Sequence, residues 1–232
     1  MKVIGLIGGL SWESSAEYYR IINEEVHRRL GGSHSAKVVL VSVDFHEVET
    51  LQHQDRWGEA TALMVDAARK VERGGAEGLV ICSNTMHRMA DQVAAAVTIP
   101  LLHIADATAR AIKAAALKRV GLLGTRFTME HDFYKGLLTA QHGLEIIIPD
   151  ESDRTMVHEV IFDELIHGEL RPTSRKAFLE IMERLVSRGA EGVILGCTEI
   201  PLLVRPGEAS VPLFDTTALH AHMAVEWALA ED

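Results

Sequence analysis

The apolar positions of the chain fall into two patterns that alternate along its length. Short, continuous apolar runs such as 79–81 and 193–195 are typical of strands buried on both faces of a parallel sheet. Longer segments such as Trp57–Arg73 place apolar residues at helical spacing and end at glycine, which readily caps a helix. Strands that alternate with helices through short connections predict an α/β fold with parallel sheets.

The same patterns assign the remaining elements. We expect further strands at 3–7, 37–43, 99–104, 120–123, 144–148 and 211–215. We expect further helices at 12–30, 85–97, 105–116, 129–142, 154–167 and 172–188. The polar segment 44–56 is expected to be a loop.

Three phrases of the first half recur in the same order in the second half. The phrases at 4–9, 75–85 and 99–103 have counterparts at 120–125, 189–199 and 211–215. This duplication predicts two similar βα-alternating domains of a Rossmann-like or flavodoxin-like kind, formed by 1–103 plus 214–232 and by 104–213. The loops of such domains gather at the carboxyl ends of the strands. We expect a pseudo-twofold axis to relate the domains and the active site to lie in the cleft between them.

The repeat also decides which polar residues are equivalent. Cys197 corresponds to Ser83, whereas Cys82 corresponds to Gly196. Because successive strand residues point to opposite faces, Ser83 and Cys197 should face equivalent directions and Cys82 should face away. Cys82 is therefore interpreted as a small buried apolar residue. Ser83 and Cys197 are the acid/base candidates, one on each wall of the expected cleft.

Composition narrows the classes of partner. The chain has 232 residues, 47% of them hydrophobic, and a formal charge of −10, which disfavours nucleic acid and anionic membranes as partners. No apolar run is long enough for a membrane span, and the chain begins at once with a strand rather than a signal peptide. Two cysteines without a disulfide framework favour a cytoplasmic location.

Motifs for common cofactors are missing. The turn at 5–9 lacks the G-x-G-x-x-G spacing of dinucleotide-binding loops, and no Walker, HExxH or CxxC pattern occurs. The turn is better suited to present backbone N–H groups to a carboxylate. We expect a small-molecule ligand, no cofactor and no metal.

Several segments together resemble one enzyme family. They are Gly-Gly-Leu-Ser-Trp-Glu-Ser at 8–14, Ser-Val-Asp-Phe-His at 42–46, Asn-Thr-Met-His at 84–87, Leu-Leu-Gly-Thr-Arg-Phe-Thr-Met-Glu at 122–130, Gly-Cys-Thr-Glu-Ile at 196–200 and Phe-Asp-Thr at 214–216. By these motifs the chain resembles the aspartate/glutamate racemase superfamily over essentially its whole length. It is most similar to the branch of broad-specificity or L-aspartate/glutamate-type amino acid racemases.

This resemblance implies a cofactor-independent reaction in which one group removes the α-proton of an amino acid and a second group protonates the opposite face.

 The implied acid/base pair is Cys197 and Ser83, and in two-cysteine relatives the second-half cysteine faces the α-hydrogen of the L-enantiomer. A thiol suits this role because its pKa lies near neutrality and falls further beside helix N-termini. The resemblance also implies a homodimer and a set of substrate-binding residues. That set is Gly9, Leu10, Ser11, Gln52, Asn84, Thr85, Thr125, Thr198 and Glu199.

Two departures from the family pattern bear on activity and specificity. Ser83 stands where most relatives have a cysteine, and a hydroxyl is a far weaker base than a thiol. Aspartate-specific relatives hold the side-chain carboxylate with basic residues. Here the loop after the second strand has only Arg56 at its end, and Thr155 to Leu170 contains no lysine or arginine. A smaller or neutral amino acid is therefore an equally good expectation.

Three alternatives remain open at this stage. A lyase resembling arylmalonate decarboxylases would need only one cysteine, because decarboxylation needs a single proton donor. A non-catalytic amino-acid-binding protein would need none. A Cys–His hydrolase would pair Cys197 with a histidine such as His87, although nothing in the sequence identifies a base.

Overall fold

The computed structural model of the protein describes residues 1–230, which fold as two compact units. The first unit contains Met1–His103 and the chain from His220 onward, and the second contains Ile104–Leu219. Each unit is built on a parallel sheet. The α/β class with parallel sheets in two similar domains, expected from the sequence, is confirmed.

The first unit has a three-stranded sheet in the order β2-β1-β3. Its elements are β1 (Ile4–Gly8), α1 (Trp12–Leu30), β2 (Val38–Ser42), α2 (Phe45–His53), α3 (Trp57–Arg73), β3 (Gly78–Ile81), the 3-10 helix η1 (Thr85–Met89) and α4 (Ala90–Ala95). Helix α11 (Thr216–Leu229) brings the chain back to this unit. All three strands run parallel, so the turns after β1 and β3 lie at the same edge of the sheet.

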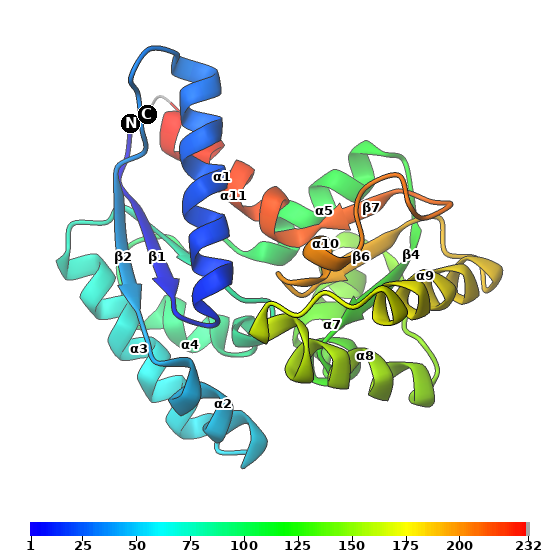
Figure 1. Cartoon of the computed structure of the whole chain (residues 1–232). Coiled ribbons are helices and arrows are strands. Elements are labelled where there is room, and N and C mark those ends of the chain that lie inside the picture. Colours follow the sequence, from blue (N-terminus) through cyan, green and yellow to red (C-terminus); the bar gives the residue numbers. More distant parts are fainter. Residues whose placement is uncertain (231–232) are drawn as a thin grey trace. The chain divides into compact units, whose positions relative to one another are not determined.

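Glycines in β1 let helices approach both faces of this sheet. A Cβ on Gly5 would lie 2.2 Å from Val71 of α3, and one on Gly8 would lie 2.6 Å from Ser15 of α1. Positions 5 and 8 point to opposite faces, so α3 covers one face and α1 the other. Figure 1 shows α1 running alongside β1 and β2.

The second unit has a four-stranded sheet in the order β5-β4-β6-β7. Its elements are α5 (Ile104–Ala114), β4 (Arg119–Gly124), α6 (Arg126–Glu130), α7 (Asp132–His142), β5 (Glu145–Ile147), α8 (Glu151–Asp163), the 3-10 helix η2 (Leu165–His167), α9 (Pro172–Ser187), β6 (Val193–Gly196), α10 (Ile200–Leu203) and β7 (Leu213–Asp215). Strands β4 and β6 end side by side, with Gly124 opposite Gly196. The residues that follow them, Thr125 and Cys197, therefore start neighbouring turns.

Each unit has its own apolar core. Ile7, Leu79 and Ile81 belong to the core of the first unit, and Leu122 and Phe178 to that of the second. Burying one large apolar side chain stabilises a protein by roughly 1.5–3 kcal/mol. The cores thus hold the strands in register and fix the turns at their carboxyl ends.

Several expected elements differ from the structure, among them the helices expected at 85–97 and 154–167, which contain the 3-10 segments η1 and η2. The segment expected to be a loop at 44–56 contains α2, which Asp44 caps by accepting a hydrogen bond from the His46 N–H at 3.1 Å. The strand expected at 99–104 is reduced to a single bridge between Leu79 and Leu101. The single helix expected at 129–142 is divided into α6 and α7.

Candidate active site

The turn after β3 carries Ser83 in the first unit. Ser83 is 9% exposed, and its Oγ accepts a hydrogen bond from the Met86 N–H at 3.4 Å. Its carbonyl oxygen accepts a hydrogen bond from His87 Nδ1 at 2.6 Å. Asn84 and Thr85 follow and are also buried, because η1 begins at once and folds the turn back on itself. The turn is therefore held by its own backbone and by one imidazole.

The loop after β1 lies close to this turn. Ser11 caps α1, its Oγ accepting a hydrogen bond from the Ser14 N–H at 3.3 Å. The Ser14 hydroxyl donates to the carbonyl oxygen of Cys82 at 3.0 Å, which ties the start of α1 to the end of β3. Leu10 is buried within the same loop. The sequence-predicted segments 9–11 and 83–85 are thus brought together within the first unit.

Gly9 has a conformation that only glycine tolerates. Its φ is +78°, and a Cβ there would lie 2.0 Å from the Val43 carbonyl oxygen. Its N–H donates to Ser15 Oγ at 2.8 Å. This donor, which the sequence predicts to bind a substrate carboxylate, is already bonded to the first turn of α1.

Gln52 reaches the same region from α2. Its side-chain amide nitrogen donates to Met86 Sδ at 3.0 Å, and the residue is 5% exposed. Met86 belongs to η1, directly after the predicted Ser83–Thr85 turn. The sequence-predicted residue is therefore adjacent to the turn, although it lies on a helix rather than in a loop.

Cys82 is buried completely and takes no part in this turn through its side chain. Burial raises the pKa of its thiol. Its backbone N–H donates to the Ile7 carbonyl oxygen at 2.9 Å, which continues the pairing of β1 with β3. This agrees with the interpretation of Cys82 as a small apolar residue of the core.

The turn after β6 in the second unit joins a thiol, a hydroxyl and a carboxylate. Cys197 Sγ donates to Glu199 Oε2 at 2.9 Å, and Thr198 Oγ1 donates to the same oxygen at 2.7 Å. The three residues are at most 9% exposed. Gly196 allows this turn to form, because a Cβ there would lie 2.9 Å from the Leu123 carbonyl oxygen in β4. The carboxylate is thus positioned to accept the proton of the thiol.

The environment of Cys197 raises its pKa. Burial is the largest cause, and the negative charge of Glu199 with its hydrogen bond adds to it. The expectation that the thiol pKa falls below its ordinary value is wrong for this arrangement, because burial and the carboxylate together outweigh the backbone N–H groups of Thr198 and Glu199. In this state the thiol is protonated and donates to Glu199.

Thr125 begins the neighbouring turn and caps α6. Its Oγ1 accepts a hydrogen bond from the Thr128 N–H at 3.3 Å. The next residue, Arg126, places a guanidinium beside this turn, 3.5 Å from Thr155 Oγ1. Arg126 was not predicted from the sequence, because basic residues near the site were expected only in two other segments. Its position directly after the predicted site residue Thr125 could have identified it.

A second group missed from the sequence is a buried histidine cluster in the first unit. The ring centroids of His87 and His103 are 4.6 Å apart, and those of His87 and His220 are 5.6 Å apart. His220 Nε2 donates to the Leu102 carbonyl oxygen at 2.7 Å, which leaves Nδ1 as the acceptor for the Tyr18 hydroxyl at 2.8 Å. Burial lowers the pKa of His87 well below its usual value and that of His220 to about 3. The imidazoles of His87 and His220 are therefore neutral in the folded protein, and His87 holds the Ser83 turn through its hydrogen bond to the Ser83 carbonyl oxygen.

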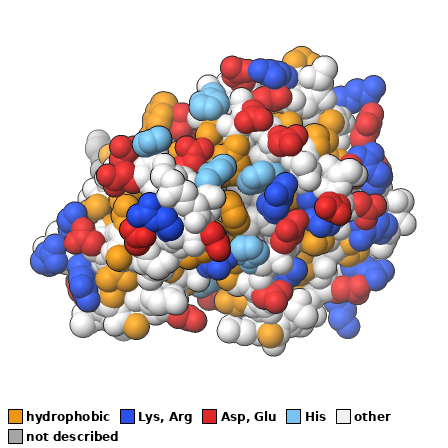
Figure 2. All heavy atoms as spheres, turned by 90° about the horizontal axis from the view of Figure 1, so that it is seen from below, with side chains coloured by type: hydrophobic (Ala, Val, Ile, Leu, Met, Phe, Trp, Pro, Cys, Tyr) orange, Lys and Arg blue, Asp and Glu red, His pale blue; other side chains and the backbone are white. Residues whose placement is uncertain are grey.

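Within residues 1–230, no group of three histidine, cysteine, aspartate or glutamate side chains is arranged to hold a metal ion. No helix in the same range is long and apolar enough to cross a membrane. Figure 2 shows acidic and basic side chains interspersed over one face, without a broad region of a single sign.

Comparison with known proteins identifies the family. The family model described as Asp/Glu/Hydantoin racemase matches residues 7–224. The chain therefore belongs to the Asp/Glu/Hydantoin racemase family. This family and its homologues make it an enzyme of the amino acid racemase class.

Individual relatives cover nearly the whole chain. The crystal structure of a Yersinia pestis protein assigned to the Asp/Glu racemases is 53% identical, covers 99% of this chain and 100% of its own, and has a TM-score of 0.93. An aspartate racemase homologue from Pyrococcus horikoshii is 34% identical over 99% of this chain and 100% of its own, with a TM-score of 0.85. The broad-specificity amino-acid racemase RacX of Bacillus subtilis is 22% identical over 98% of this chain and 99% of its own. The lyase and the non-catalytic binding protein are not favoured by these comparisons.

Proposed function

We propose that the protein racemises free α-amino acids by proton transfer at the α-carbon, without pyridoxal phosphate or another cofactor. In this proposal Cys197 and Ser83 transfer protons at opposite faces of that carbon. The observation that carries this proposal is the hydrogen bond from the Cys197 thiol to the Glu199 carboxylate, 2.9 Å long. It pairs a candidate proton-transfer group with a proton acceptor in a buried turn.

The first step begins from the protonated thiol. Glu199 accepts the thiol proton, and the resulting thiolate removes the α-hydrogen of the substrate as a proton. The electron pair of the broken C–H bond enters the substrate as an enolate-like carbanion. Cys197 is then a thiol again, and Glu199 is a neutral acid that can return its proton to solvent.

The second step protonates the opposite face. The Ser83 hydroxyl, or a water that it holds, gives a proton to the α-carbon and regains one from solvent. Ser83 Oγ accepts the Met86 N–H, so its own hydrogen can be directed elsewhere. In the reverse direction the same hydroxyl must act as a base, for which it is poorly suited because an aliphatic hydroxyl ionises so much less readily than a thiol.

The carbanion needs hydrogen-bond donors at the α-carboxylate. The amide of Asn84 and the hydroxyls of Thr85, Thr125 and Thr198 supply them in this proposal. Thr198 donates to Glu199 at 2.7 Å in the resting state. When Glu199 accepts the thiol proton it becomes a weaker acceptor, and the Thr198 hydroxyl becomes available to the substrate.

The substrate in this proposal does not need a side-chain carboxylate. Arg56, at the end of the segment after the second strand, donates to both carboxylate oxygens of Glu59, with its Nε 2.7 Å from Oε1. Arg126 directly follows the candidate substrate-binding residue Thr125, and its guanidinium contacts Thr155. Neutral amino acids should therefore be accepted, and acidic ones should depend on Arg126.

Racemisation of a panel of amino acids tests the proposal. Wild-type protein, Cys197→Ala and Cys82→Ala are incubated with L-alanine, L-leucine, L-aspartate and L-glutamate, and the D-enantiomers are measured by chiral chromatography. We expect D-enantiomer from at least one substrate with wild-type protein and with Cys82→Ala, and none with Cys197→Ala. A folded Cys197→Ala variant that racemises at the wild-type rate would contradict the proposal.

We also infer that the protein is a cytoplasmic homodimer. Trp12 and Tyr19 lie seven residues apart on α1, so they share a face, and they are 70% and 52% exposed. Exposed aromatic side chains on one helix face favour an interface. Both cysteines are free and buried, which suits a reducing compartment. Light scattering of wild type and Trp12→Ser, together with cell fractionation, tests these two inferences.

A further inference from the structure

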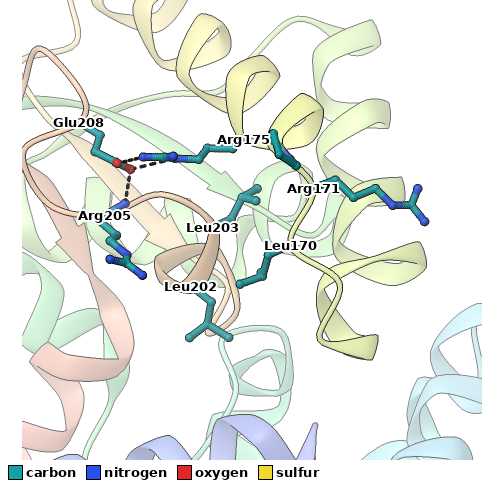
Figure 3. Close-up of a pocket in the computed structure, with 8 residues that line it drawn as sticks. Leu170, Arg171, Arg175, Leu202, Leu203, Arg205 and Glu208 are labelled. Carbon is teal, nitrogen blue, oxygen red and sulfur yellow. Dashed lines mark hydrogen bonds and ion pairs between the residues drawn. The ribbon is translucent and has the colours of Figure 1, made fainter.

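A pocket of about 330 Å³ lies in the second unit, and none of the candidate catalytic residues lines it. Its walls come from the start of α9 and from α10 with the loop that follows (Figure 3). The lining residues are Leu170, Arg171, Pro172, Arg175, Leu202, Leu203, Arg205 and Glu208. This volume is at the lower end of the range for small-molecule sites, about 300–1,000 Å³.

The apolar part of the pocket is exposed to solvent. Leu170 is 50% exposed and Leu202 is 44% exposed, whereas Leu203 behind them is buried. Two exposed leucines in one concave site would gain from contact with an alkyl group, because such contact removes apolar surface from water. The pocket thus favours a ligand with an apolar body.

Of the three arginines that line the pocket, two are paired with carboxylates of the described residues and one is not. Arg175 is paired with Glu208, its Nε 3.2 Å from Oε2. Arg171 is paired with Glu164 and Glu169, and its guanidinium extends away from the other labelled residues in Figure 3.

Arg205 supplies the excess charge. Its backbone N–H donates to Glu208 at 2.8 Å, while its guanidinium extends away from that carboxylate, on the side of Leu202 (Figure 3). Within residues 1–230, the Arg205 guanidinium has no ion pair or hydrogen bond. A guanidinium binds a carboxylate through two parallel hydrogen bonds. The net charge of the site therefore suits a ligand with a single negative charge.

We propose that this pocket is a regulatory site for a small monocarboxylate with an alkyl body, held by Arg205 and packed on Leu170 and Leu202. The pocket is connected to the candidate catalytic turn through the backbone of α10. The Leu202 N–H donates to the Glu199 carbonyl oxygen at 3.0 Å, and the Ile200 N–H donates to that of Cys197 at 3.3 Å. A ligand that holds α10 in place therefore acts on the residues that hold the thiol and its acceptor.

Calorimetric titration with 4-methylpentanoate tests the binding site. Acetate lacks the alkyl body and 4-methylpentan-1-ol lacks the charge, so both should bind at least about tenfold more weakly. Arg205→Gln should weaken binding of 4-methylpentanoate by about ten- to a hundredfold, the range for a lost hydrogen bond to a charged group. Arg171→Gln is the matched control and should bind as wild type does.

The same variants separate this proposal from the proposed function. Binding by Cys197→Ala protein should equal that of wild type, whether or not the protein racemises amino acids. Arg205→Gln should keep the basal racemisation rate and lose the change in rate that 4-methylpentanoate causes in wild type. Absence of binding to wild type, or equal binding by folded Arg205→Gln, would overturn the site. Binding without any change in the wild-type rate would overturn its regulatory role.

Discussion

The relation between Cys197 and Glu199 sets the state of the candidate catalytic thiol. A buried thiol beside a carboxylate is held in its protonated form, since burial and negative charge both disfavour the thiolate. The same carboxylate gives the thiol proton a nearby acceptor at 2.9 Å. In the proposed mechanism, Glu199 thus both restrains the thiol at rest and accepts its proton during the reaction.

Glu199→Gln separates these two effects. Removing the charge lowers the Cys197 pKa, so the thiol should react faster with iodoacetamide at neutral pH, measured in a Cys82→Ala background. Removing the proton acceptor should lower kcat by about 10²- to 10⁴-fold, the usual contribution of a general acid–base group. Slower alkylation, or unchanged kcat, would show that Glu199 does not have this double role. Glu183→Gln, on the exposed part of α9 and bonded to the Ser210 N–H, is the control.

By the family resemblance, Ser83 stands where a second thiol is expected. Ser83→Cys should raise the rate of α-proton removal from D-amino acids by about tenfold or more, because a thiol is a far stronger base at neutral pH than a hydroxyl. Single-turnover measurements with each enantiomer give the two rates. Unchanged rates in a folded variant would place Ser83 away from the substrate.

At the scale of elements, glycine positions and turn residues place the candidate residues at the strand ends within each unit. Strands β1, β3, β4 and β6 were predictable because continuous apolar runs between glycines are a local signal. Helix α2 was not, because its polar composition resembles a loop and its stability depends on the Asp44 cap and on the buried Val48. The pairing of Cys197 with Glu199 depends on side-chain directions within a turn, which sequence spacing does not determine.

The histidine cluster makes stability of the first unit dependent on pH. His220 has a pKa of about 3 when folded, below the value of about 6.5 in an unfolded chain. The unfolded state therefore binds one more proton between these values, and the stabilising effect is complete above pH 6.5 and is lost as the pH falls toward 3. Each unit of pH in this window should lower the free energy of unfolding by about 1.4 kcal/mol through His220 alone.

Urea unfolding of wild type and His220→Gln between pH 4.5 and 6.5 checks this effect. The variant should be less stable at neutral pH, since it loses bonds to Tyr18 and Leu102, but its stability should fall less steeply as the pH decreases. His34→Gln, which changes an exposed histidine, should retain the wild-type slope. Equal slopes for wild type and His220→Gln would contradict the assignment of a buried neutral imidazole.

At the scale of the whole molecule, duplication made the fold predictable and left parts of the chemistry undetermined. Repeated phrases identify equivalent turns, so Ser83 and Cys197 could be aligned from the sequence. The histidine cluster could not be predicted, because Tyr18, His87, His103 and His220 come from widely separated segments with no shared spacing. The same holds for the pocket beside α10, whose walls join segments 170–175 and 202–208.

The central claim is that two unlike groups serve the two faces of one α-carbon. If Cys197 faces the α-hydrogen of the L-enantiomer, as the family resemblance implies, L-amino acids meet the thiol and D-amino acids meet the Ser83 hydroxyl. Enantiomers have equal free energies in water, so only rates can differ. The base strengths differ by several pKa units, each worth about 1.4 kcal/mol between protonation states.

This difference is measured most directly by exchange of the α-hydrogen with D₂O. Proton NMR monitors the exchange for both enantiomers of the best substrate. The account predicts that the L-enantiomer exchanges its α-hydrogen faster than it inverts and that the D-enantiomer exchanges slowly. Exchange at equal rates from both enantiomers under the same conditions would contradict it.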